Sequence, residues 1–528
     1  MPSRSSFFFI LLAACSLTGQ TAAPTDSGKP ASVEGVVTDA VTGTPIPRVH
    51  VSLRGAGGRQ PHQYATASGA DGKFSITGIA PGSYQIDGRR VGFVMPSGPR
   101  AGNRVELKDG DTRTDLSIAL TPTGAITGHV TDADGNPVEG ATVEAQGGTR
   151  SGDSSSTDEQ GQFRIGGLAP GRYRVIASHG EMWGDRPEIR TDGTVEHHDA
   201  ATYYPGVLTE KEAGSVVVRA AGESPGVDIQ MVRVPFVRVR GKVVGMPSKV
   251  ERAEITVWHS NGGSGIDLKP DGSFELWRLD PGKYRLEAEW EGPDGERVHT
   301  SGGDIEVAGS NIDGIELRVV ADSKIAVRLE FEDDQVKQTI AQASFGPVVR
   351  LSQLSVEDIN DVSAPIGKDG TFRLAKVPAG RYRVGLVGYD KAYIKSMQLG
   401  STAVDGAVLD LSNGSGGADL TLLLSASTGS ISGVIQDDAG NAANIMVVLT
   451  ASDEDSDFEP RRTSAGADGK YSFENLPPGT FKLVATAESD PATQGNNVLG
   501  YEKQMETVTV GIGEKVTKDL RRRMPDDQ

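Results

Sequence analysis

Residues 161–175 read GQFRIGGLAPGRYRV, and this stretch decides the fold. A first glycine, Gly161, is followed two residues later by Phe163, and a second, Gly171, is followed two residues later by Tyr173. Apolar and polar residues alternate after each glycine, which is the period of a half-buried β-strand. The stretch therefore predicts two strands that each begin at a turn.

The same pattern occurs five times along the chain, and the two glycines are always ten residues apart. The pairs are Gly72 and Gly82, Gly161 and Gly171, Gly272 and Gly282, Gly370 and Gly380, and Gly469 and Gly479. Aspartate precedes four of the first glycines, which favours a hairpin turn with positive φ. Proline precedes four of the second glycines, which favours a turn with a left-handed glycine. Such regular spacing indicates tandem copies of one unit.

The alternation also predicts which side chains face the core. The inward pairs are Phe74 and Ile76, Phe163 and Ile165, Phe274 and Leu276, Phe372 and Leu374, and Tyr471 and Phe473 on the first strand, with Tyr84 and Ile86, Tyr173 and Val175, Tyr284 and Leu286, Tyr382 and Val384, and Phe481 and Leu483 on the second. An earlier strand carries a glycine in four repeats, at Gly35, Gly128, Gly241 and Gly433. Repeat four has Ile325-Ala326-Val327-Arg328-Leu329 instead.

Composition agrees with an all-β chain. The 528 residues include 68 glycines and 28 prolines, with only 5% aromatic residues. This favours many short strands and tight turns, and about seven strands per repeat predict β-sandwiches. We expect five tandem domains with short linkers, arranged as a semi-rigid rod. The predicted boundaries are 1–23 for a signal peptide, 32–122, 124–233, 235–321, 323–426 and 428–521 for the sandwiches, and 522–528 for a tail.

Repeat two carries the clearest family resemblance, through Gly128-His129-Val130-Thr131-Asp132, Gly140-Ala141-Thr142-Val143 and Leu168-Ala169-Pro170-Gly171-Arg172-Tyr173. It resembles the carboxypeptidase regulatory-like domain of the transthyretin (prealbumin) type. Repeats one and five match less fully, and repeats three and four keep mainly the paired turns. The resemblance implies Ig-like sandwiches with a spacer or interaction role, and it carries over no catalytic residue.

The N-terminal segment predicts export. Arg4 precedes an apolar run, residues 7–14, that is too short to span a bilayer as a helix. The run ends in Leu12-Ala13-Ala14-Cys15, which resembles a bacterial lipobox, so Cys15 is the predicted lipidation site. We expect an outer-membrane or surface lipoprotein; the alternative is ordinary cleavage near residues 21–23 and a periplasmic or secreted protein.

Charge and residue types exclude several function classes. The net charge of −18 disfavours nucleic acid and anionic lipid as partners. Cys15 is the only cysteine, so it excludes an internal disulfide, and none of the eight histidines begins a His-x-x-Glu or His-Glu-x-x-His motif. We therefore expect no catalytic residue, metal or cofactor.

Three short motifs could suggest a metal, and Lys242 could suggest an isopeptide bond. Glu196-His197-His198-Asp199 and the acidic loop 453–459 favour solvated surface over ligation, although calcium at the loop stays open. Residues 132–136 resemble the start of a calcium loop, but Pro137 stands at the glycine position and Val143 at the position of the bidentate glutamate, so a turn is favoured. Lys242 lies in an early strand of repeat three without a matching late-strand asparagine.

Aromatic residues supply the candidate binding sites. Strand parity predicts that Trp258 and Trp277 of repeat three point outward and that Trp290 belongs to the core. Two outward indoles could stack on a sugar, or seal a domain junction. Tyr203 and Tyr204 form an aromatic insertion in repeat two that could bind a partner, although capping of a domain end is favoured.

Three functions from different classes fit these features. The leading hypothesis is a non-catalytic cell-envelope scaffold whose repeats are spacers and protein-interaction modules. The others are a carbohydrate-binding envelope protein and an accessory subunit of a separately encoded hydrolase or transporter. The expected partner is an envelope protein or polysaccharide.

Overall fold

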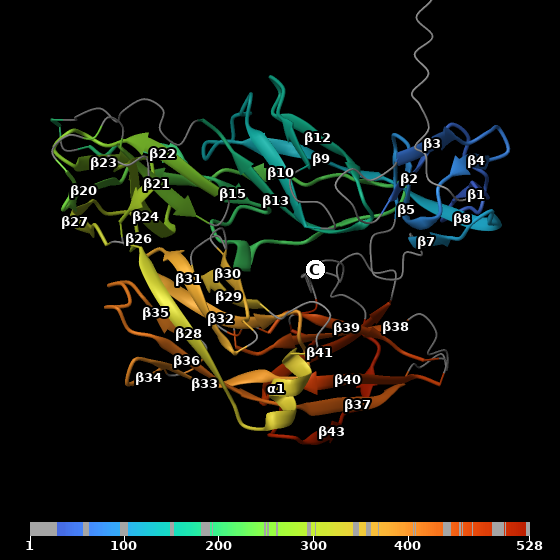
Figure 1. Ribbon diagram of the computed structural model, residues 1–528. Helices are drawn as coiled ribbons and strands as arrows, with labels where there is room; N and C mark the ends of the chain where they lie inside the picture. The colour runs from blue at the N-terminus through green and yellow to red at the C-terminus, as the bar shows by residue number, and fades with distance from the viewer. Residues whose placement is uncertain are drawn as a thin grey trace, which may run out of the picture. The chain divides into compact units, whose positions relative to one another are not determined.

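The fold is nearly all β, as predicted, with one short helix (Figure 1). The computed structural model describes residues 29–55, 63–95, 104–147, 153–180, 191–192, 194–247, 250, 253–259, 262–292, 297–300, 302–320, 322–341, 348–354, 361–367, 369–404, 406, 408–436, 445–453, 456, 458–466, 468–487, 501 and 503–523. The predicted signal peptide with Cys15 lies outside these residues, as does part of the acidic loop 453–459.

The strands of the first two repeats follow the predicted order. Repeat one contains β1 (Ala31–Asp39), β2 (His50–Gly55), β3 (Gln63–Ala67), β4 (Lys73–Ile79), β5 (Gly82–Arg89), β6 (Phe93–Val94), β7 (Arg104–Leu107) and β8 (Thr112–Pro122). Repeat two contains β9 (Gly124–Thr131), β10 (Thr142–Gly147), β11 (Asp153–Ser156), β12 (Gln162–Leu168), β13 (Gly171–Ser178), β14 (His197–Asp199), β15 (Thr202–Tyr203), the 3-10 turn η1 (Glu210–Glu212), β16 (Val216–Val218), β17 (Glu223–Ser224), β18 (Ile229–Gln230) and β19 (Arg233–Pro235).

The later repeats keep the same order, and repeat four adds the helix. Repeat three contains β20 (Arg238–Val244), β21 (Ala253–His259), β22 (Gly262–Asp267), β23 (Ser273–Trp277), β24 (Gly282–Glu291), β25 (Arg297–His299), β26 (Gly303–Val307) and β27 (Ile312–Arg318). Repeat four contains β28 (Ser323–Phe331), α1 (Asp334–Ala341), β29 (Val348–Gln353), β30 (Asp361–Pro365), β31 (Thr371–Val377), β32 (Arg381–Val387), β33 (Tyr393–Leu399), β34 (Thr402–Val404), β35 (Val408–Asp410) and β36 (Leu420–Ser425). Repeat five contains β37 (Gly429–Gln436), β38 (Ile445–Ala451), β39 (Arg461–Ser464), β40 (Lys470–Leu476), β41 (Gly479–Ala487), β42 (Glu506–Val510), β43 (Lys515–Thr517) and β44 (Leu520–Arg521).

Each repeat supplies two sheets with one topology. The first strand pairs antiparallel with the strand that carries the first aromatic residue, and parallel with a late strand, as β9 does with β12 and β17. The second sheet is built on an antiparallel pair such as β10 and β13. The contacts divide the chain into two compact units, Met1–Arg90 with Gly98–Leu120 and Val91–Ser97 with Thr121–Gln528. The five predicted domain boundaries therefore stay a prediction.

The hairpin predicted at the first glycine is wrong, because β11, before the turn at Gly161, pairs with β10, whereas β12, after it, pairs with β9 in the other sheet. β12 lies in the sheet of β9, whereas β13 lies in the sheet of β10. The connection at Pro170-Gly171 therefore passes from one sheet to the other. Both strands still face one core, because their inward residues approach it from opposite sides.

The first glycine of each pair has the predicted positive φ, for example 72° at Gly161. The left-handed conformation predicted for the second glycine is wrong: Gly171, Gly380 and Gly479 do not have positive φ, and Gly82 and Gly282 have φ values of 157° and 159°, which are near-extended. The left-handed residue instead lies six positions after the first glycine in every repeat. These residues are Gly78 (φ 76°), Gly167 (82°), Arg278 (62°), Lys376 (58°) and Asn475 (57°).

The glycine of the first strand makes room for an aromatic ring and for the late strand. A Cβ at Gly128 would lie 1.9 Å from the carbonyl oxygen of Val227 and 3.1 Å from the ring of Phe163. At Gly241 it would lie 2.2 Å from the ring of Phe274. Contacts below 3.0 Å force a shift of the backbone or the ring. Glycine is therefore required for close approach at these positions.

Repeat four shows what happens without this glycine. Val327 stands opposite Phe372, in the register that glycine occupies in the other repeats. Phe372 is only partly buried, whereas Phe163 is 4% exposed. The aromatic ring at this predicted inward position is thus buried in repeats one, two, three and five, and only partly buried in repeat four. Val336 and Ile340 of α1 join the core of repeat four.

Four repeats share a hydrogen bond across the proline-containing connection. The Tyr173 hydroxyl donates to the Ala169 carbonyl at 2.7 Å. Tyr84, Tyr284 and Tyr382 make the same bond to the carbonyl four residues earlier. Burial raises the pKa of Tyr173 to about 12, so the hydroxyl remains a donor at neutral pH. Phe481 stands at this position in repeat five.

Replacing Gly128 tests the close approach. We expect Gly128→Ala to destabilise the protein by about 1–3 kcal/mol, because the new methyl group meets a backbone carbonyl that cannot turn away. The matched control is Gly166→Ala, since a Cβ there meets only the end of the flexible Arg164 side chain, at 2.7 Å. Urea unfolding of both variants measures the difference. Equal stability of the two would contradict this explanation of the glycine.

Candidate functional site

The two outward tryptophans of repeat three lie on different sheets. Trp258 is on β21, which pairs with β22 and β24. Trp277 is on β23, which pairs with β20 in the other sheet. Each alternates with buried residues of its strand and is partly exposed, whereas Trp290 is 4% exposed and lies in the core as predicted. The two indoles point from opposite faces of the sandwich, so they do not form one platform.

The Trp258 indole lies against the neighbouring strand. A Cβ at Gly263 would lie 2.3 Å from the indole Cε3 atom. On the other side, Trp258 stands opposite Arg285 in the β21–β24 register. Part of the ring is therefore covered by its own sheet.

The aromatic insertion of repeat two packs into the domain. Tyr203 is 4% exposed and pairs with Ile176 of β13. Tyr204 packs against the core of repeat two, and its amide donates to the Val175 carbonyl at 2.8 Å. Tyr203 therefore has no exposed ring face to offer a partner.

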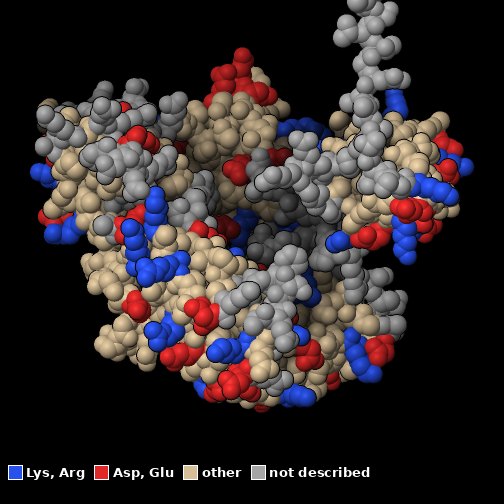
Figure 2. Space-filling view, in the orientation of Figure 1, with Lys and Arg blue, Asp and Glu red and all other residues tan. Residues whose placement is uncertain are grey.

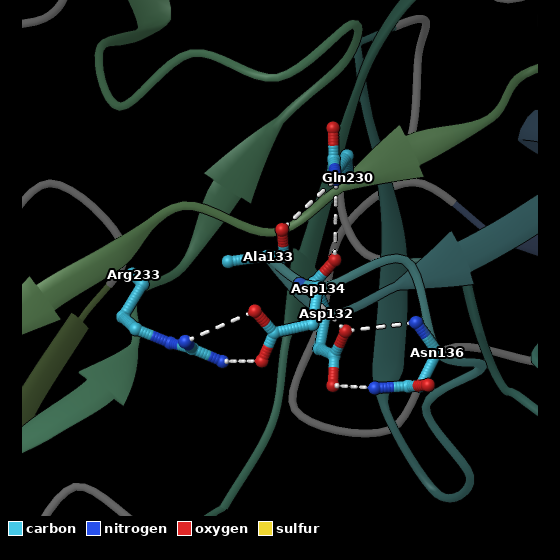
Figure 3. Close-up of polar contacts among 6 residues, drawn as sticks. All are labelled: Asp132, Ala133, Asp134, Asn136, Gln230 and Arg233. Carbon is cyan, nitrogen blue, oxygen red and sulfur yellow. Dashed lines mark hydrogen bonds and ion pairs between the residues drawn. The ribbon is translucent and has the colours of Figure 1, made fainter.

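The turn at residues 132–136 uses its carboxylates internally (Figure 3). Oδ1 of Asp132 accepts the amides of Asp134 and Asn136 at 2.9 and 2.8 Å, and Oδ2 accepts the Asn136 side chain at 3.0 Å. The bonds from Asn136 lower the pKa of Asp132. The turn is thus a hydrogen-bonded aspartate turn, as the sequence favoured over a calcium loop.

The same turn holds the chain that leaves repeat two. Arg233 forms a two-pronged ion pair with Asp134, at 2.6 Å from Nη2 to Oδ2 and 3.3 Å from Nη1 to Oδ1. The hydrogen bond to Asp134 and its charge raise the pKa of Arg233. Nε2 of Gln230 donates to the carbonyls of Ala133 and Asp132 at 3.3 and 3.5 Å (Figure 3). The two bonds of Arg233 to Asp134 therefore hold the start of β19 against this turn.

β14 and β19 form a two-stranded ribbon where repeat two meets repeat three. His197, His198 and Asp199 pair with Pro235, Val234 and Arg233. Adjacent histidines point to opposite faces, so His197 is exposed while the His198 side chain is 5% exposed. His198 lies against Phe236, with 4.7 Å between ring centroids. Only His198 is thus placed to contact the junction, and among the described residues no three His, Cys, Asp or Glu side chains form a metal-binding group.

Asp280 of repeat three forms hydrogen bonds with the ribbon and with the residues that follow β14. Nε2 of His198 lies 2.8 Å from Oδ1 of Asp280, and the Ala201 amide donates to Oδ2 at 2.9 Å. A carboxylate oxygen accepts hydrogen bonds, so this geometry suits donation from Nε2 of His198. Nδ1 is buried without a hydrogen-bond partner in the described part of the chain. We define the His198–Asp280 junction as the candidate functional site, formed by these two residues, Ala201 and Phe236.

Sequence reasoning missed this site, although one signal was present. Two residues before the second glycine, repeats one and two have Ala80 and Ala169, whereas repeat three has Asp280. A charged residue at a position that alanine fills elsewhere indicates a partner outside the repeat's own core.

Polar contacts also join later repeats. Nη2 of Arg350 in repeat four donates to Oε1 of Glu459 in repeat five at 2.7 Å. Arg285 of repeat three is buried and pairs with Glu287 at 3.0 Å. A Cβ at Gly380 of repeat four would lie 3.5 Å from its guanidinium. Lys242, in contrast, is exposed on β20.

The comparisons with known proteins support the family resemblance. Residues 32–121, 125–201 and 430–521 match the family model of the carboxypeptidase regulatory-like domain. These three regions of the chain belong to that family. No curated protein sequence matched the chain.

Several solved structures are similar at low identity. A streptococcal ancillary pilin is 12% identical, with 55% of this chain and 99% of that chain covered and a TM-score of 0.21. The minor pilin of Streptococcus agalactiae is 14% identical, with 39% and 97% covered and a TM-score of 0.24. Two B repeat units of the collagen-binding protein of Staphylococcus aureus are 9% identical, with 75% and 99% covered and a TM-score of 0.16. At such TM-scores these similarities say nothing of function. In the described ranges, no helix is long and apolar enough to cross a membrane.

A double-mutant cycle tests the His198–Asp280 junction. We expect His198→Ala and Asp280→Ala each to destabilise the full chain, with a coupling energy of about 1–3 kcal/mol, as for hydrogen bonds to a charged partner in a partly buried place. Asp280→Ala introduces the residue that repeats one and two carry, so the fold of repeat three itself should tolerate it. Thermal and urea unfolding provide the four stabilities. Additive effects of the two substitutions would refute the contact.

Proposed function

We propose that the protein is a non-catalytic cell-envelope scaffold, in which tandem sandwiches hold attached partners at a fixed spacing and orientation. The His198–Asp280 junction is the observation that carries this proposal. A flexible tether needs no contact between neighbouring domains. A scaffold that fixes orientation does need one.

Two features of the junction support a scaffold role. The exit strand β19 is held on one side by the Asp134–Arg233 ion pair and on the other by its ladder with β14. The ribbon then reaches Asp280 through one side chain and one backbone amide. A domain rotation about this linker would break the bonds to Asp280 together, which disfavours free motion.

The proposed partner is another envelope protein. Figure 2 shows basic and acidic side chains scattered among other residues on the described surface in this view. Mixed charge of this kind suits protein surfaces better than the polyanions of nucleic acid. A carbohydrate platform built jointly from Trp258 and Trp277 is disfavoured by their placement on opposite sheets.

Native proteolysis tests the rigidity of the junction. Trypsin can cut after Arg233 and Arg238, on both sides of the linker. We expect both bonds to resist cleavage in the folded chain, because β19 and β20 hold these residues in ladders. Mass spectrometry of the fragments identifies the cuts, and the urea-unfolded chain is the control. Rapid cleavage after Arg233 in the folded chain would overturn the scaffold proposal.

The location at the envelope rests on the lipidation proposed for Cys15. We expect Cys15→Ala to block maturation and to release the protein from the membrane fraction, because a single thiol is the attachment point for the acyl chains. Ser16→Ala is the matched control, since it leaves the thiol in place. The measurement is immunoblotting of fractionated cells. Unchanged processing and membrane association of Cys15→Ala would exclude the lipid anchor.

A further inference from the structure

The left-handed position six residues after the first turn glycine carries a side chain in three repeats. Arg278, Lys376 and Asn475 have φ values of 62°, 58° and 57°. The corresponding residues of repeats one and two are Gly78 and Gly167. Glycine adopts this conformation without a steric penalty, whereas arginine and lysine do not. A side chain retained at such a position needs a compensating interaction.

Arg278 makes its contact with the preceding repeat. Its Nη2 atom donates to the His179 carbonyl oxygen at 2.8 Å. His179 is the first residue after β13, which ends at Ser178. A Cβ at Gly180 would lie 2.3 Å from the same Nη2 atom, so the guanidinium lies directly against the main chain there. The arginine therefore reaches the end of a strand in repeat two.

Asn475 makes the equivalent contact from repeat five. Its Nδ2 atom donates to Oδ2 of Asp390 at 3.4 Å. Asp390 lies three residues after the end of β32, the strand of repeat four that corresponds to β13. Nη1 of Arg461 donates to the carbonyls of Glu474 and Asn475 at 2.9 and 3.3 Å, which holds the left-handed backbone. Two different side chains thus reach the same end of the preceding repeat.

We propose that this left-handed residue is a junction-positioning residue, whose side chain binds the strand end of the preceding repeat and sets the angle between the two. The inference rests on the proposed scaffold function and names the surface that performs it.

Distance measurements between spin labels test the proposal in the full chain. Labels at Ser154→Cys in repeat two and Lys269→Cys in repeat three, in a Cys15→Ala background, report the angle between these repeats. Both sites are exposed. Arg278→Gly should broaden the distance distribution, because it removes the hydrogen bond between the repeats. The turn itself should be preserved, since glycine adopts a positive φ without a steric penalty. A second pair, Lys269→Cys with Glu306→Cys, lies within repeat three and should not change.

Two controls separate positioning from folding. Arg240→Ala removes another exposed arginine of repeat three, one that pairs with Glu275 and Asp313 of the same repeat, and should leave both distributions as in the parent. Arg278→Gly should keep the parent's midpoint of thermal unfolding or raise it. A broadened distribution for the second pair, within repeat three, would mean that Arg278 serves its own repeat, and would overturn the proposal.

The outcomes distinguish this inference from the proposed function. A narrow distribution in the parent that Arg278→Gly broadens supports both. A narrow distribution that Arg278→Gly leaves unchanged overturns the positioning role and leaves the scaffold standing. A distribution that is already broad in the parent overturns the scaffold itself.

Discussion

The packing of an aromatic ring over a glycine is the contact on which four of the five repeats depend. The ring belongs to the strand that opens at the first turn, and the glycine to the first strand of the repeat, as with Phe163 and Gly128. Without a Cβ at the glycine, the ring can seal the core while a late-strand carbonyl approaches from the other side. Burial of one such ring stabilises a domain by roughly 1.5–3 kcal/mol, which is a large part of the net stability of a small domain.

Repeat four shows that this contact can be replaced, but only by rebuilding the surrounding sheet. Val327 takes the glycine position, and Phe372 is partly exposed. The first sheet then grows to the order β31-β28-β36-β33-β34, and α1 adds Val336 and Ile340 to the core. The helix thus brings two buried side chains to a core in which one ring is only partly buried.

Strand parity predicted the inward residues well, because a period of two depends only on which side chains meet water. Parity cannot show which sheet a strand joins, so the turn at Gly161 predicts a hairpin although β11 and β12 lie in different sheets. The left-handed position was missed for a related reason. Arg278, Lys376 and Asn475 give no sign of positive φ in the sequence, whereas the aspartate–glycine turns do.

The candidate site was hidden for another reason. His198 sits between His197 and Asp199, and such a polar run is usually solvated. Only the pairing of β14 with β19 turns one histidine inward and brings it to Asp280. A contact between repeats depends on two surfaces at once, so neither repeat alone contains the information. The sign of this contact in the sequence is Asp280, which stands where repeats one and two have alanine.

The residues that stabilise each repeat differ from the residues that contact a neighbouring repeat. The ring lies inside its own repeat, as do the glycine of four repeats and the tyrosine bond of four repeats, and changes there cost stability. The left-handed residue and the position two before the second glycine point away from that core. They vary among glycine, arginine, lysine and asparagine in one case, and among alanine, aspartate and proline in the other. Each junction can therefore change while the sandwiches on either side keep their packing, so one repeated fold can produce several different angles along a single chain.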